Sequence, residues 1–223
     1  EEKLQDIAGY LGTVLQADGD DFSIYQEYFM AHHDEMDVPV DFDDEDALEA
    51  RNRYETLFSE QYPGKTLGQD ITFAELSPQV QNAFAVYHHE RYLLLFEKAR
   101  DIFDLIYTYY VGPAEEPLVM CYVLDAVREV REPSGATIDL GQMVEQVLER
   151  HGKMWEAWNT GTIPSGYDTY DNEYGKTYAW YVPLYVGGEK LGLISTEVEI
   201  DDYNKAIAAN TMRQLASIAA VLL

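Results

Sequence analysis

The sequence predicts an α+β fold, in which an antiparallel sheet of about five strands follows a long helix and leads into a final exit helix. Two observations predict it. Apolar residues recur at helical spacing until about residue 104, and extended β-branched and aromatic segments follow. These segments form two pairs, each joined by a short turn rich in glycine or proline, as in β-hairpins. A sheet of this kind needs helices on at least one face to complete a core.

The first hundred residues are predicted to be mainly helical. Apolar periodicity indicates three helices, at residues 4–16, 23–33 and 46–60. The longest helix begins at Ser77-Pro78, where a capping serine precedes a proline at the first helical position, and it continues to about residue 104. A further helix is expected at 140–150, a shorter one at 154–158, and the exit helix at 203–223, capped by Asp201 or Asp202.

The strands account for most of the remaining chain. The predicted hairpins comprise residues 106–111 with 118–124, and residues 177–186 with 190–200. A short fifth strand is expected near Tyr170. Pro183 cannot donate to a ladder, which points to a sheet edge or a bulge there. The predicted organisation is an N-terminal helical region (1–76), a core that contains the sheet (77–201) and a C-terminal helix (202–223).

Composition excludes several classes of protein. The net charge of −26 repels phosphate backbones and anionic lipid, so we expect no nucleic-acid partner. Residues 1–60 carry 18 acidic and 3 basic side chains, densest at 41–46, which we interpret as a solvated loop and helix start. No motif in the sequence assigns a function to the acidic region 18–65. Cys121 is the only cysteine and is predicted to be buried in a strand, so an intrachain disulfide is impossible.

Motifs for metal, cofactor or nucleophilic chemistry are missing from the sequence. The paired histidines lie next to each other rather than one helical turn apart, and His88-His89-Glu90 is expected on a helix surface. The acidic run lacks the glycine and the glutamate of a calcium loop. No Gly-x-Ser-x-Gly, P-loop or dinucleotide fingerprint is present. We therefore expect no metal, no cofactor and no enzymatic activity.

Aromatic residues gather between Trp155 and Tyr185. Six of the 18 tyrosines fall between positions 167 and 185. Tyrosine and tryptophan suit a small-molecule pocket because each offers an apolar face and one hydrogen-bonding tip. Asp168, set among them, is suited to a ligand ammonium group, with cation–π contacts from the rings. Core packing remains the preferred interpretation for any single residue here, and a pocket the preferred one for the segment.

Three runs in this region resemble one family. They are Met-Trp-Glu-Ala-Trp-Asn-Thr-Gly at 154–161, Pro-Ser-Gly-Tyr-Asp at 164–168, and Asp-Asn-Glu-Tyr-Gly-Lys-Thr-Tyr-Ala-Trp-Tyr-Val-Pro-Leu at 171–184. With the hairpin at 183–194, they resemble Cache-type (PAS-like) extracytoplasmic sensor domains of bacterial membrane receptors. The resemblance implies a PAS-like sheet, flanking helices that connect to transmembrane segments outside this chain, and a cytoplasmic kinase, phosphatase, cyclase or chemotaxis module.

The resemblance also implies a site between the sheet and the loops that cover it. The expected ligand-binding residues are Tyr122, Trp155, Trp158, Tyr167, Asp168, Tyr178 and Trp180. The implied ligand is a small molecule such as an amino acid, an amine or a carboxylate. The implied partner is a second copy of the chain, paired through the flanking helices, and the implied location is the extracellular face of the membrane.

Two other functions remain open at this point. One is an extracellular protein-interaction domain without a small ligand, in which exposed tyrosines bind a partner. The other is a secreted hydrolase that uses paired carboxylates, and it requires two acidic groups facing each other in a cleft.

Overall fold

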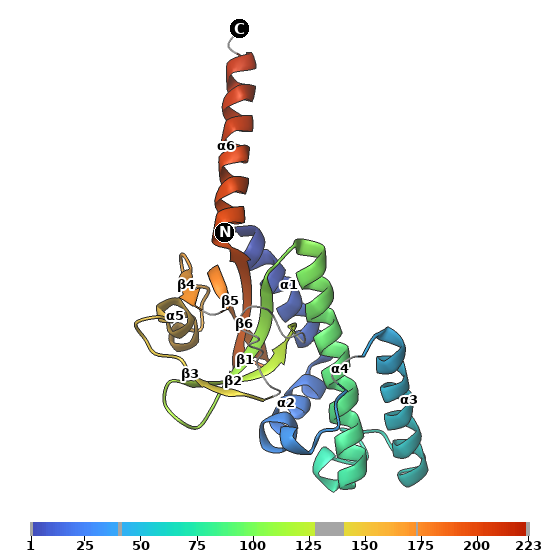
Figure 1. Ribbon diagram of the computed structural model, residues 1–223. Coiled ribbons are helices and arrows are strands. Elements are labelled where there is room, and N and C mark those ends of the chain that lie inside the picture. Colours follow the sequence, from blue (N-terminus) through green and yellow to red (C-terminus); the bar gives the residue numbers. More distant parts are fainter. Residues whose placement is uncertain (1, 40–41, 128–140, 173, 222–223) are drawn as a thin grey trace.

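The computed structural model describes residues 2–39, 42–127, 141–172 and 174–221 (Figure 1). The helices are α1 (Glu2–Asp18), α2 (Asp20–His32), α3 (Asp44–Gln61), α4 (Pro78–Phe103), α5 (Gly152–Thr160) and α6 (Ile200–Val221), with short 3₁₀ turns at His33–Glu35 and Phe73–Glu75. The strands are β1 (Tyr107–Pro113), β2 (Val119–Asp125), β3 (Met143–Glu145), β4 (Asp168–Asn172), β5 (Gly175–Val186) and β6 (Glu189–Glu199).

All neighbouring strands of the sheet are antiparallel, in the order β3-β2-β1-β6-β5-β4. Without β3, the strands follow the order second, first, fifth, fourth, third, which is the order of a PAS-like sheet. The predicted α+β fold and both hairpins are confirmed. The described strands number six rather than about five, because β3 adds a short edge strand beside β2.

The helix predicted at 140–150 is wrong over the part of it that the structure describes. Residues 143–145 form β3, which pairs with Val119–Cys121, and turns flank it on both sides. The pairing supplies backbone hydrogen bonds that a helix would otherwise make within itself, so tertiary context overrides a weak helical pattern. The helix predicted at 154–158 is confirmed, and in the structure it is longer, Gly152–Thr160 (α5).

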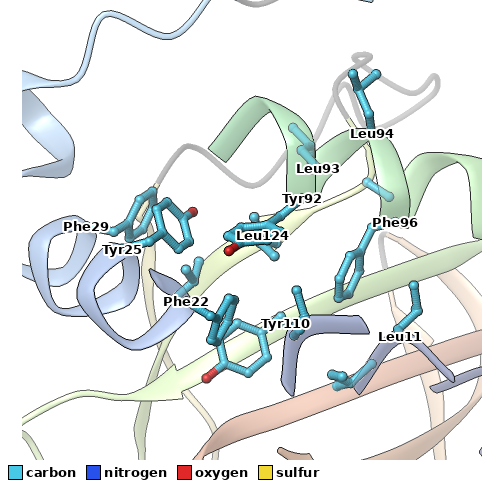
Figure 2. Close-up of a cluster of buried hydrophobic side chains, with 14 of the residues drawn as sticks. Leu11, Phe22, Tyr25, Phe29, Tyr92, Leu93, Leu94, Phe96, Tyr110 and Leu124 are labelled. Carbon is cyan, nitrogen blue, oxygen red and sulfur yellow. The ribbon is translucent and has the colours of Figure 1, made fainter. Parts of the chain in front are cut away.

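The two faces of the sheet are covered differently, and we call them the α1 side and the α5 side. α1, α2 and α4 pack on the α1 side, and α5 lies on the opposite side (Figure 1). The α1 side holds the main aromatic core, in which Phe22 contacts Tyr92 and Tyr110 edge to face, with ring centroids 5.2 and 5.4 Å apart (Figure 2). Cys121 is buried in this core, as predicted.

Two pairs of buried polar side chains lie within hydrogen-bonding distance in and around this core. The Tyr110 hydroxyl donates to Gln26 Oε1 at 2.6 Å, and the Tyr25 hydroxyl lies 2.7 Å from His89 Nδ1. Paired groups of this kind avoid the desolvation cost of an unmade hydrogen bond.

The placement of His88-His89-Glu90 on a helix surface is wrong. All three side chains are buried, because α4 packs against α2 and α3 as well as against β1 and β2. Burial lowers the pKa of His88 to about 3, so this imidazole is neutral at pH 7.

The acidic run begins a helix, as predicted for its described part. Asp43 accepts hydrogen bonds from the backbone N–H groups of Glu45 and Asp46, and the Asp46 side chain accepts one from the backbone of Asp43. This capping box places acidic residues in the first turn of α3, where the helix dipole favours them.

Pro183 has an edge environment, as expected. It pairs with Leu193 of β6, whereas β4 pairs only with residues 175–179 of β5. One side of β5 therefore has no paired strand at Pro183. A register shift follows immediately, between Leu184 and Tyr185.

α6 follows β6 without a loop and extends away from the rest of the molecule (Figure 1). It begins at Ile200, so Asp201 and Asp202 lie in its first turn and do not cap it, contrary to expectation. The start of α1 lies beside the start of α6, and Tyr203 packs against the cluster of Leu4, Ile7 and Trp180. Within the described ranges, no helix combines the length and apolar character that a membrane crossing requires.

Gly192 marks a close approach of β6 to β1. A Cβ atom at this position would lie 2.3 Å from the Val111 carbonyl oxygen and 2.5 Å from the Tyr110 hydroxyl. We expect Gly192→Ala to lower the free energy of unfolding by about 1–3 kcal/mol through overpacking. Urea titration measures this. Gly9→Ala in α1 is the matched control, since nothing lies within 4 Å of the added methyl. Equal stability of the two variants would contradict the prediction.

Candidate functional site

A cavity of about 260 Å³ opens on the α5 side of the sheet. β1, β5 and β6 form its floor, β2 and β3 border one side, and β4 with the start of α5 borders the other. Its polar lining residues are Tyr107, Tyr109, Tyr122, Asp125, Gln142, Glu145, Gln146, His151, Tyr170, Asn172, Tyr174, Thr177, Tyr181 and Glu197. Val127, Val144 and Met154 complete the lining.

The floor residues of the cavity lie on one face of the sheet because side chains alternate along each strand. Tyr109 and Tyr181 both pair with Ser195, one from each side of β6, and Glu197 lies two residues further along the same face. Thr177 lies on the same face of β5. Four polar side chains from three neighbouring strands therefore converge on one area of the sheet.

Glu197 is the most unusual of these residues. Its side chain is only 5% exposed. The Tyr109 hydroxyl donates to Oε1 at 2.7 Å, and the Thr177 hydroxyl donates to Oε2 at 2.6 Å. Burial raises the pKa of Glu197, the two hydroxyl hydrogen bonds counteract the shift in part, and the charge of Asp168 adds to it.

A hydrogen-bonded chain of hydroxyl groups borders the cavity. The Tyr170 hydroxyl lies 2.6 Å from that of Tyr181 and 2.7 Å from His151 Nδ1. Burial lowers the pKa of His151 to about 4, with a further contribution from Arg150, so the imidazole is neutral at pH 7. Burial also raises the pKa of both tyrosines, which therefore remain protonated. This part of the wall is uncharged and offers hydroxyl groups.

Asp168 anchors the start of α5 to β4. Its carboxylate accepts hydrogen bonds from the backbone N–H of Lys153, at 2.9 and 3.1 Å, and from that of Met154, at 3.1 Å. These N–H groups belong to the first turn of a helix and have no partner within it. Burial raises the pKa of Asp168, and the backbone hydrogen bonds counteract part of that shift. The structure thus gives Asp168 a helix-anchoring contact.

Of the seven residues expected from the sequence, Tyr122 lines the cavity. Trp155 lies just behind the lining, where its indole N–H donates to the Gln146 carbonyl at 2.6 Å. Trp158 lies further along α5, and Lys190 Nζ sits 4.3 Å from the centre of its ring and donates to its carbonyl.

Tyr167, Tyr178 and Trp180 lie apart from the cavity. Tyr178 and Trp180 project from β5 on the α1 side, and Tyr167 packs on both, with ring centroids 4.2 and 5.0 Å away. The aromatic segment is thus divided between the two sides of the sheet. As ligand contacts, the seven residues remain a prediction.

Several lining residues were not expected from the sequence. Tyr107 and Tyr109 precede the aromatic segment, and Glu197 belongs to a strand singled out only for its hairpin. One signal was available for Glu197: it is the single acidic residue in the run 191–198, at an alternate position with Leu193 and Ser195. Within the described part of the chain, no three histidine, cysteine or acidic side chains are grouped as metal ligands.

The sequence matches no protein-family model and no curated protein. Among solved structures, it is similar to the sensory domain of the Campylobacter jejuni chemoreceptor Tlp3 (CcmL), with 9% identity over 87% of this chain and 66% of that chain, at a TM-score of 0.35. The ligand-binding domain of Tlp3 in complex with L-valine gives 8% identity over 86% and 64%, with a TM-score of 0.35. The Tlp3 domain with isoleucine bound gives 9% identity over 86% and 64%, with a TM-score of 0.34.

These TM-scores are too low to decide a family, and the chain spans less than two thirds of the length of these structures. The strand order and the flanking helices are independent of them. On those features, the chain has the PAS-like α+β fold that its resemblance to Cache-type sensor domains predicts.

Proposed function

We propose that this chain is the extracytoplasmic ligand-sensing domain of a transmembrane receptor, and that a small molecule binds in the cavity on the α5 side. The proposal rests on the cavity itself. Glu197, a buried carboxylate of β6, is one of its lining residues, and β6 leads directly into the exit helix α6. Concave sites with a few converging polar groups are the usual form of small-molecule sites.

The position of Glu197 supports a route for the signal. It lies three residues before Ile200, where α6 begins, and its two hydroxyl donors belong to β1 and β5. A ligand that contacts Glu197 therefore contacts the last residues of β6, directly before α6. To shift the output, that ligand must bind one arrangement of β6 and α6 more tightly than the other.

The remaining parts of the proposal follow the resemblance. Transmembrane segments outside these residues attach the domain, and a cytoplasmic module receives the signal. Two copies pair through their flanking helices, since two-fold homodimers are the commonest oligomers. The boundaries 1–76, 77–201 and 202–223 also remain a prediction.

A cavity-filling variant tests the proposal. A thermal-shift screen of amino acids, amines and short carboxylates should yield a ligand that raises Tm by about 5–10 °C when present at a hundred times its Kd. Val144→Trp should abolish this rise, because Val144 of β3 lines the cavity. Met143→Trp is the matched control, because Met143 is 45% exposed and, unlike its neighbour Val144, is not among the residues that line the cavity.

The outcomes separate the candidate functions. If a ligand still raises the Tm of the Val144→Trp variant, its binding site lies outside this cavity. If no compound raises Tm, the sensing proposal fails, and a protein-interaction domain without a small ligand becomes the better account.

A further inference from the structure

The charge balance around Glu197 indicates what kind of ligand the cavity takes. This inference rests on the function proposed above and deepens it. A buried carboxylate is costly unless a cation or several hydrogen bonds compensate it. Glu197 has two hydroxyl donors, whereas a carboxylate accepts about four hydrogen bonds.

No described cationic side chain pairs with Glu197. Of the described residues that line the cavity, none is lysine or arginine. His151 is the one lining residue able to carry a positive charge, and burial keeps it neutral at pH 7. Asp125 and Glu145 are the other two acidic residues of the lining. The described lining therefore favours a positive ligand.

The tyrosine rings favour the same kind of ligand. Tyr109 and Tyr122 lie with their ring centroids 5.1 Å apart, and Tyr107, Tyr170 and Tyr181 join them around the cavity. The face of an aromatic ring attracts cations, and this attraction strengthens as water is excluded. A ring-lined cavity with a carboxylate in its floor suits an ammonium group with a small apolar body.

The same lining is poorly suited to a free carboxylate. Besides its acidic residues, the described lining supplies hydroxyl and amide groups rather than a guanidinium or ammonium group, and the buried carboxylate of Glu197 repels a second negative charge. A zwitterion would bring its own carboxylate into this field. An amine without a carboxylate would not.

We propose that the cavity binds a small amine that carries a net positive charge and no carboxylate, with its ammonium group hydrogen-bonded to Glu197. The tyrosine rings contact its body and its charge. The cavity volume of about 260 Å³ limits the body to a short alkyl chain or a single ring.

Three matched series test this proposal by isothermal titration calorimetry on the whole 223-residue chain. Each series compares an amino acid with the amine that lacks its carboxylate and with the acid that lacks its amino group. The first is L-valine, isobutylamine and isovalerate; the second is L-leucine, isoamylamine and 4-methylpentanoate; the third is L-phenylalanine, phenethylamine and 3-phenylpropanoate. At least one amine should bind about tenfold or more tightly than its amino acid, and the acids should not bind.

Glu197→Gln tests the contact itself. Glutamine keeps the shape and accepts a hydrogen bond, but it carries no charge, so amine affinity should fall by about tenfold or more. Glu189→Gln is the matched control at the exposed opposite end of the same strand, and it should leave the affinity unchanged. Circular dichroism and urea titration check that both variants fold.

Each outcome has a distinct meaning. Tighter binding of the amino acids or the acids than of the amines would overturn the charge assignment while leaving the sensing function in place. Amine binding that Glu197→Gln does not weaken would overturn the contact. If nothing in the three series binds but an amino acid or a carboxylate from the broader screen does, the amine assignment fails alone, whereas binding of a different amine would support it. If nothing binds in either experiment, the sensing function fails with it.

Discussion

Trp180→Ala is expected to lower the free energy of unfolding by about 3–5 kcal/mol, the largest effect that we predict for a single substitution. Trp180 is 1% exposed and packs with Leu4 and Ile7 of α1. It also contacts the Tyr203 ring of α6 at 5.6 Å between centroids. Removing the indole leaves a cavity at the junction of the sheet with both flanking helices.

Trp158→Ala is the matched control, because it makes the same chemical change at a half-buried position on α5. We expect a clearly smaller loss, mainly the packing of the ring and its contact with Lys190. Urea titration of both variants measures the difference. If the two losses were equal, Trp180 would not have the structural role that its position on the α1 side indicates.

A second measurement on Trp180 separates stability from binding. Trp180→Phe keeps much of the apolar volume, so the protein should remain folded at 25 °C. Because Trp180 lies on the side of the sheet away from the cavity, this variant should bind the cavity ligand with unchanged affinity. A large loss of affinity in the folded variant would show that the cavity is not the site.

Asp168→Ala is expected to lower the free energy of unfolding by about 2–3 kcal/mol. The substitution removes the carboxylate that accepts from the backbone N–H groups of Lys153 and Met154. These groups would be left without an acceptor at the start of α5, and hydrogen bonds to charged groups are among the stronger ones. Because His151 and Met154 line the cavity, ligand affinity should fall as well.

Asp171→Ala provides the control from the same strand. Its side chain is 69% exposed and forms an ion pair with Lys176 at 3.0 Å, so the loss should stay within about 1 kcal/mol. Hydrogen exchange gives the local measurement: amides of α5 should exchange faster in Asp168→Ala and at the normal rate in Asp171→Ala. Unchanged exchange in α5 after Asp168→Ala would contradict the anchoring contact.

The candidate site could be predicted only in part. The sequence pattern indicated Tyr122 and the α5 segment that borders the cavity, and it singled out Asp168 among the aromatic residues. The prediction gave Asp168 a ligand contact, whereas in the structure its carboxylate accepts from backbone N–H groups at the start of α5. It also grouped Tyr178 and Trp180 with residues from which the sheet separates them. Proximity along a strand does not reveal the face, since neighbours alternate.

The long helices and both hairpins follow from the sequence alone, because apolar periodicity and turn residues are local signals. The helix that ends near residue 103 and the turn at Gly187-Gly188 are examples. Only the tertiary structure decided β3, the burial of His88 and His89, and the environment of Glu197. Each of these depends on partners far away in the chain: Glu197 is bonded by Tyr109, 88 residues earlier. Long-range pairing of this kind determines which polar groups lose water, and no local pattern records it.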